Sequence, residues 1–127
     1  MSVTHSTALR DTLCNAAVDA LDAGSADASG DMRIDTSGNV EVALLVFSNP
    51  AFGASSSGTA TASAITSDTN ADGGTAAKAI LRNRDNTTCI SCSVTASGGG
   101  GDLIISNTTV GVGDTVSCSS LTYSAPP

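Results

Sequence analysis

The chain has 127 residues and a mass of 12.4 kDa, the size of one small domain. Ser, Thr, Ala and Gly make up 67 of these residues, and 12 acidic against 5 basic side chains leave a formal net charge of −7. A chain this acidic is poorly suited to bind nucleic acid phosphates. Because it has no apolar run of about 18 residues and no apolar stretch at its start, we expect neither a membrane span nor a secretory signal.

The composition also bears on stability. Burial contributes roughly 25 cal/mol per Å² of apolar surface, while ordering one residue costs about 1–2 kcal/mol of backbone entropy. Ala, Ser and Thr bring little apolar surface, and the aromatic residues are only Phe47, Phe52 and Tyr123. We therefore expect the chain to gain further burial from copies of itself or from a larger partner.

Residues 6–23 are predicted to form a helix. Ser6 or Thr7 can cap its start, and Gly24 suits the left-handed position after its end. Arg10, Asn15 and Asp22 are placed on the opposite, polar face. The apolar face has the i, i+4, i+7 spacing of an amphipathic helix and consists of Leu9, Leu13, Ala16, Ala17, Ala20 and Leu21.

The rest of the chain has the period of two that is typical of strands. Asn, Asp and Gly turns separate the predicted strands, which are residues 32–35, 40–47, 59–65, 76–82, 88–95, 102–106 and 115–124. This pattern predicts a mainly β fold, an antiparallel sandwich or barrel with one N-terminal helix. We divide the chain into 1–30, a helix or arm with a linker, and 31–127, a β-sandwich domain. The helix could pack on the sheet or extend to a neighbour.

Side-chain alternation predicts which face of two strands is buried. In 40–47, Val40, Val42, Leu44 and Val46 share one face, and the other face becomes apolar only toward its end, at Leu45 and Phe47. In 88–95, Ile90, Cys92 and Val94 share one face. Inward positions of this kind are the ones that would contact the core.

The four cysteines are predicted to be mainly buried free thiols. Cys89 and Cys92 form a C-x-x-C pair, but zinc or redox chemistry needs further ligands or a helix start that this segment lacks. A single disulfide is the alternative. Its best pair is Cys92 with Cys118, because both occupy inward-facing strand positions.

Residues 68–73 match the first half of a calcium-binding loop. Asp68, Asn70 and Asp72 alternate and Gly73 follows, but Ala79 stands where a bidentate Glu is required. These residues are a weak calcium candidate, and an ordinary turn is the favoured interpretation.

No arrangement of residues predicts an enzyme. The single histidine, His5, lies near the start without the orienting group that a catalytic base needs. The glycine run 98–101 is not followed by the Lys and Ser/Thr of a phosphate-binding loop. We therefore expect no catalytic residues and no cofactor.

Two long segments resemble a known family. The segments are SNPAFGASSSGTATASAITSDTNADGG and GGGGDLIISNTTVGVGDTVSCSSLTYSAPP, and the helix before them is LRDTLCNAAVDALDAG. These segments and this helix are similar to small virion structural proteins of tailed bacteriophages. The chain departs from that pattern at residues 78–80, where an aromatic-containing strand is expected, and in its pair Cys89 and Cys92. The resemblance implies a structural role in head or tail and brings no catalytic residues.

The resemblance and the composition together predict a capsid decoration (cement) protein or minor capsid protein. It would form a homo-oligomer, bind the major capsid protein or other virion proteins, and be found in the virion and, during assembly, in the host cytoplasm. The alternatives are a neck, collar or tail protein and, second, an adhesion or carbohydrate-binding module. The candidate interface residues are Leu9, Leu13, Ala17, Leu21 and an exposed Phe52; a Phe52 that caps the core is the equally weighted alternative.

Overall fold

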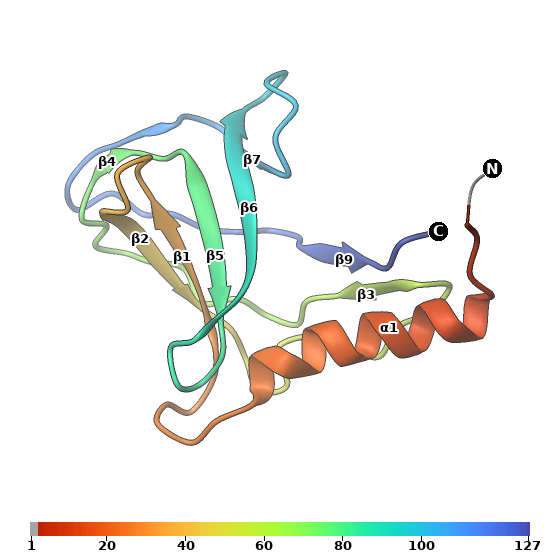
Figure 1. Cartoon of the computed structure of the whole chain (residues 1–127). Coiled ribbons are helices and arrows are strands. Elements are labelled where there is room, and N and C mark those ends of the chain that lie inside the picture. Colours follow the sequence, from red (N-terminus) through yellow and green to blue (C-terminus); the bar gives the residue numbers. More distant parts are fainter. Residues whose placement is uncertain (1–2) are drawn as a thin grey trace.

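In the computed structural model, which describes residues 3–127, one helix lies beside a curled sheet (Figure 1). The helix α1 (Thr7–Asp19) continues into a short 3₁₀ turn, η1 (Ala20–Asp22). The strands are β1 (Asp31–Asp35), β2 (Glu41–Val46), β3 (Thr59–Thr61), β4 (Gly74–Thr75), β5 (Lys78–Arg82), β6 (Thr88–Ala96), β7 (Leu103–Ile105), β8 (Thr109–Val110) and β9 (Thr122–Ser124).

The main sheet has the strand order β2-β1-β5-β6-β7. Its pairs are antiparallel except β6 and β7, which run parallel, and two small antiparallel pairs, β3-β9 and β4-β8, complete the fold. The predicted fold class, mainly β with one N-terminal helix, is confirmed. Of the predicted strand 115–124, only Thr122–Ser124 forms a strand. The serine-rich residues 117–120 make no backbone hydrogen bonds to a neighbouring strand in the described part of the chain.

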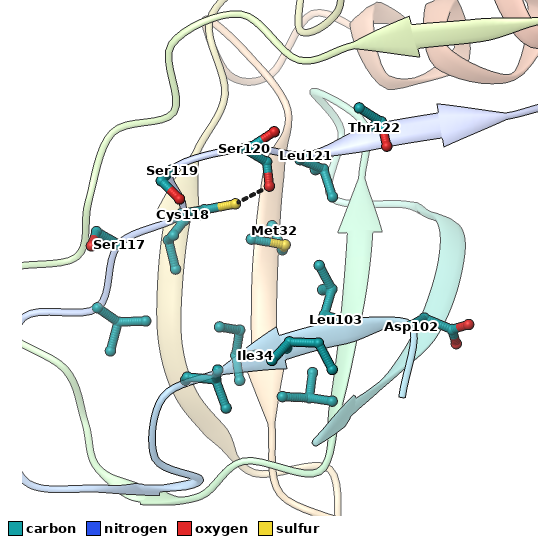
Figure 2. A pocket seen from close by; sticks show the side chains of 15 residues that line it. Met32, Ile34, Asp102, Leu103, Ser117, Cys118, Ser119, Ser120, Leu121 and Thr122 are labelled. Atoms are coloured by element: carbon teal, nitrogen blue, oxygen red, sulfur yellow. Dashed lines mark hydrogen bonds between the residues drawn. The ribbon is translucent and has the colours of Figure 1, made fainter. Parts of the chain in front are cut away.

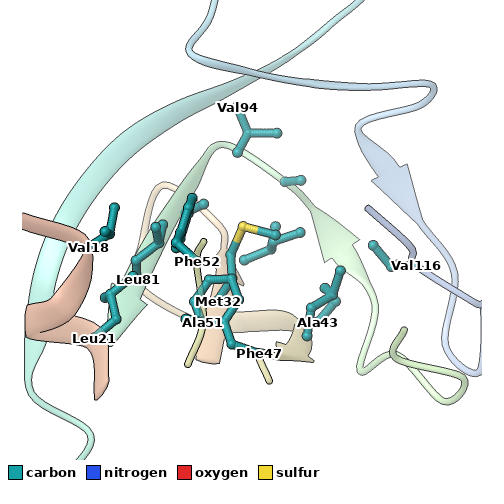
Figure 3. Packing of buried hydrophobic residues seen from close by; sticks show 14 of the residues in the cluster. Val18, Leu21, Met32, Ala43, Phe47, Ala51, Phe52, Leu81, Val94 and Val116 are labelled. Atoms are coloured by element: carbon teal, nitrogen blue, oxygen red, sulfur yellow. The ribbon is translucent and has the colours of Figure 1, made fainter. Parts of the chain in front are cut away.

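The core lies on one face of the main sheet. Ile34 of β1 stands between Ala43 and Ala79, and Met32 stands between Leu45 and Leu81, so these alternate residues face the same way. The core side chains are buried together with residues of the helix and the loops (Figure 3). On β6 the predicted inward face is confirmed. Val94 is buried, and Ile90 and Cys92 pack against the core.

The predicted face of β2 is wrong. Ala43, Leu45 and Phe47 are the buried alternate residues, while Val40 and Val46 are exposed. The register shifts between Ile34 and Asp35, and Val42 is the extra residue at this bulge. Val42 is nevertheless buried, and its side chain lies close to the Gly74 backbone of β4. Both faces of this strand are apolar, so alternation could not decide between them.

The outer face of the main sheet carries a network of ion pairs. Arg82 of β5 binds its register partner Asp31 with two hydrogen bonds, 2.7 Å from Nε to Oδ1 and 2.9 Å from Nη2 to Oδ2. Arg33 donates to Asp35 across 2.7 Å. Asp31 and Asp35 are both buried, and their bonds to arginine satisfy the carboxylates.

The helix packs on the strands rather than extending as an arm. Ser6 caps its start by accepting from Leu9 N, as predicted, and Cys14, Val18 and Leu21 enter the core. The axis of α1 runs along β3 (Figure 1), and the helix contacts β3 and β9.

Polar residues of the helix also face the body, which corrects the predicted polar face. Asp11 accepts from Gly58 N and Ser55 Oγ, both at 2.7 Å. Asn15 accepts from Ser55 N, and Asp22 accepts from Ala51 N, each at 2.8 Å. These side chains satisfy loop N–H groups that would otherwise lack partners near the helix.

Candidate functional site

A stripe on α1 displays apolar side chains to solvent. Leu9 is 43% exposed and Leu13 is 40% exposed, and Ala16 is exposed one turn further along. They follow the i, i+4, i+7 spacing, so they lie on one side of the helix. We call Leu9, Leu13 and Ala16 the helix stripe. Ala17, another predicted interface residue, is half-buried beside it.

Two predicted interface residues belong to the core instead. Leu21 is 0% exposed and Phe52 is 4% exposed, so neither can contact a partner. Phe52 packs on Phe47 with ring centroids 6.0 Å apart. The last turn of the helix packs against the rest of the domain, and the loop after β2 folds back over the core. Of the predicted apolar interface residues, these two placements leave Leu9 and Leu13 exposed and Ala17 half-buried.

A cavity of about 350 Å³ opens between the sheet and the segment that leads to β9 (Figure 2). Met32, Ile34, Leu45 and Val94 form its apolar floor. Leu103 of β7 closes one side, and the serine-rich residues 117–120 cross the other. The four floor residues are buried, so the accessible apolar side chains of the cavity are those of the half-buried Leu103 and Leu121.

A second cavity, of about 380 Å³, continues the first along β7. Both are lined by Ile104, Ile105, Val116 and Ser117, so the two form one groove. We call it the β7 groove. Its far end is polar, with Asn107, Thr109 and Asp114 among the lining residues.

The segment 117–120 spans the groove without backbone partners. Val116 and Asp68 exchange backbone hydrogen bonds at one end, and Leu121 accepts from Ala62 N at the other. Between these anchors, no backbone hydrogen bond joins residues 117–120 to another backbone group within 3–127. Among the residues that the structure describes, β7 has β6 as its single partner strand.

The charged residues among those lining the groove are both acidic, Asp102 and Asp114. Asp102 accepts from Ser93 N and Ser93 Oγ, both at 3.0 Å. These bonds hold the pKa of Asp102 below its ordinary value, the backbone bond being the larger cause. Asp102 is therefore ionised at neutral pH, and the groove is negative.

Two of the candidate calcium residues, Asp68 and Asp72, interact with other groups of the chain. Asp68 Oδ2 accepts from Leu44 N at 2.9 Å, and Oδ1 accepts from Asn70 N at 2.9 Å. Asp72 lies near Glu41, and the pKa of Glu41 is raised first by burial and second by this neighbouring carboxyl. Among residues 3–127, no group of three or more His, Cys, Asp or Glu side chains is placed to hold a metal ion.

All four cysteines are free thiols, so the alternative disulfide between Cys92 and Cys118 is not formed. Cys118 donates to Ser120 O at 3.4 Å, and Cys92 donates to Ala79 O at 3.7 Å. Burial raises the pKa of both thiols. Cys14 is fully buried and Cys89 is exposed. The favoured prediction of free thiols agrees with this arrangement, but the predicted burial holds only for Cys14, since Cys92 and Cys118 are half-buried and Cys89 is exposed.

His5 joins the two ends of the chain. Its Nδ1 lies 2.8 Å from Pro127 O, and Arg10 donates to Pro126 O and Ala125 O. This role was not predicted, since nothing in the sequence brings the C-terminal residues to the start of the helix. The β7 groove was not predicted either, because it depends on how the segment after Val116 crosses the sheet.

The structure and the sequence were compared with known proteins. In the part of the chain that the structure describes, no helix has both the length and the hydropathy needed to cross a membrane. The chain matches no protein-family model, no curated protein and no solved structure. The function proposed for this chain therefore rests on its own residues and surfaces.

Proposed function

We propose that the chain is a structural component of a tailed-bacteriophage virion, a capsid decoration (cement) or minor capsid protein that binds its neighbours through the helix stripe. The observation that carries this proposal is the exposure of Leu9 and Leu13 on a helix that is otherwise fixed to the body. The sequence resemblance supports the kind of assembly, and the exposed leucines support binding to other subunits.

The stripe is a rigid surface. Asp11 and Asn15, on the other side of the same helix turns, hold the loop at Ser55 and Gly58 through hydrogen bonds of 2.7–2.8 Å. A helix held in this way loses little further conformational freedom when it binds. Each contact would be small, but many copies on one lattice add their contacts, and attachment becomes strong through multivalency.

A neck, collar or tail protein is the alternative, because the same stripe would serve in a ring of fewer subunits. The adhesion or carbohydrate-binding alternative has less support. Sugar sites use exposed aromatic faces, whereas Phe47 and Phe52 are buried and Tyr123 is half-buried.

The experiment replaces the two leucines by serine, as a Leu9→Ser and Leu13→Ser double variant. Because both side chains lie on the surface and outside the core cluster, we expect the melting temperature and circular dichroism to change little. We expect the amount incorporated into particles to fall about tenfold or more, which corresponds to about 1.4 kcal/mol of lost binding. Asp19→Ser, an exposed change on the same helix outside the stripe, is the control and should incorporate normally. Normal incorporation of the double variant would refute the helix stripe as the interface.

A further inference from the structure

We propose that the β7 groove binds an extended segment of a different protein, apolar at alternate residues and flanked by Lys or Arg, which adds a strand at the free edge of β7. This goes beyond the proposed function, because it assigns a second surface, separate from the helix stripe, and names the chemistry of its partner.

The two edges of the main sheet differ. On β2, the outer edge is closed by the chain itself: Val46 and Thr66 exchange backbone hydrogen bonds of 3.2 and 2.8 Å, and Asp68 accepts from Leu44 N. Gly73 N also donates to Val42 O at 3.2 Å. Proteins usually protect a sheet edge in such ways, because unpaired N–H and C=O groups bind other strands.

The edge at β7 has no such closure in the described residues. β7 pairs with β6 alone, and the groove separates its outer edge from residues 117–120, which also lack backbone partners. Two rows of free backbone groups therefore border one groove. An extended peptide is the ligand that can bond to such rows, as in other cases of strand addition.

The floor of the groove determines the side chains of the partner. Met32, Ile34, Leu45 and Val94 form an apolar floor but are only 0–5% exposed. The apolar side chains that an added strand would contact are the half-buried Leu103, Ile105 and Leu121, which also line the groove. In an added strand, alternate side chains would point toward this floor and the others toward solvent. Apolar residues are therefore expected at every second position of the partner.

Charge distinguishes a foreign partner from a second copy. Asp102 and Asp114 are the charged residues that line the groove, at its two cavities. A second copy that paired through its own β7 edge would bring a second Asp102 and Asp114 to the groove, and these like charges would repel. Lys or Arg beside the added strand would instead be attracted to both aspartates.

The probe is a short fluorescent peptide that alternates Val and Thr between terminal lysines, titrated into the full chain at low salt and followed by fluorescence anisotropy. We expect it to bind about tenfold or more tightly than the same peptide with terminal glutamates. The lysine peptide N-methylated at the amides that face β7 cannot donate hydrogen bonds to a strand, so it should bind as weakly as the glutamate peptide. Equal affinity for all three peptides, or no binding by any, would overturn the proposal.

Protein variants then locate the binding. Asp102→Asn with Asp114→Asn keeps acceptor oxygens for Ser93 and Gly111 but removes the charge, so we expect the preference for lysine over glutamate to disappear. Asp19→Asn is the matched control and should keep it. The bound peptide should also slow alkylation of Cys118, which lines the groove, while the exposed Cys89 provides the internal reference.

Three further results separate this proposal from the proposed function. The Leu9→Ser and Leu13→Ser variant should bind the peptide normally; loss of peptide binding there would place the site on the helix and overturn the groove. Dimerisation of the chain that the lysine peptide disrupts would make a second copy the occupant and would also overturn it. Peptide binding by a chain that is missing from particles would support the groove while refuting the virion role.

Discussion

The carboxylate of Asp68 accepts a hydrogen bond from the backbone nitrogen of Leu44, with Oδ2 2.9 Å away, and so closes the outer edge of β2. Its other oxygen accepts from Asn70 N. The D-x-N-x-D-G segment that resembles a calcium loop is in this fold an edge cap. The same chain leaves the edge of β7 open, and the difference between the two edges is the basis for the proposed strand addition.

Replacement of Asp68 by alanine should weaken the β2 edge. Two hydrogen bonds to backbone N–H groups are lost, which should lower the free energy of unfolding by about 1–2 kcal/mol. The newly open edge should also make the variant aggregate in a concentration-dependent way. Chemical denaturation and light scattering measure the two effects.

Asp68→Asn is the control, because its amide oxygen can still accept from Leu44 N. It should lose less stability than the alanine variant. Millimolar calcium should leave the melting temperature of the unmodified chain unchanged. A clear rise with calcium would show that these residues form a cation site after all.

The secondary structure could largely be predicted from the sequence, for physical reasons. The helix start at Ser6 and the strands β1, β2, β5 and β6 follow local signals, namely a cap, a change of period and Asn or Gly turns. The buried face of β2 could not be predicted, because Val42 and Val46 are as apolar as Ala43 and Leu45, and the bulge beside Asp35 decides between them.

The ion pair between Arg82 and Asp31 should contribute strongly to stability. Their side chains are only 15% and 10% exposed, and the two bonds are parallel and short. Arg82→Ala would leave the Asp31 carboxylate without its partner and should cost about 2–4 kcal/mol. Arg82→Lys keeps the charge but lacks the planar fork, so its loss should be intermediate. Equal stability of all three proteins in urea would contradict this account.

The contact between the helix and the loop should be sensitive to acid. The backbone bond from Gly58 and then the bond from Ser55 lower the pKa of Asp11 below its ordinary 3.8. A lowered carboxyl pKa adds stability that is complete above the ordinary value and is lost as the pH falls through the lower, folded value. Asp11→Asn should therefore be less stable than the unmodified chain at neutral pH, and the difference should vanish in strong acid. Thermal melts of both proteins across this range measure it.

Phe52 should behave as a core residue. It is 4% exposed and contacts Phe47, so Phe52→Ala should destabilise the fold by about 3–5 kcal/mol. Phe52→Leu retains most of the buried volume and should cost less. A stable Phe52→Ala protein that fails only in binding would restore the interface role predicted from the sequence.

The cysteines should react with a thiol reagent in a fixed order. Cys89 is exposed and should react first, whereas burial raises the pKa of Cys92 and Cys118, which should react more slowly. Cys14 is fully buried and should react only after unfolding. Mass spectrometry of the labelled peptides measures the order. Failure of both Cys92 and Cys118 to react even after unfolding without reductant would indicate a disulfide.

The candidate surfaces could be predicted only in part. Leu9 and Leu13 follow from helical spacing, but Leu21 shares that spacing and is buried, because the last turn bends into the core. Which leucines remain free depends on where the loops near Ala51 and Ser55 meet the helix. The β7 groove depends on contacts between residues distant in the chain, such as Asp68 with Val116, which local patterns do not encode.

The central claim is that the chain is a structural part of a tailed-phage particle, and quantitative mass spectrometry of purified particles tests it most directly. We predict that the chain is present in stoichiometric amount. Hundreds of copies would place it on the capsid shell, and about a dozen would fit a ring at the neck or tail. Absence of the chain from intact, purified particles would contradict the claim.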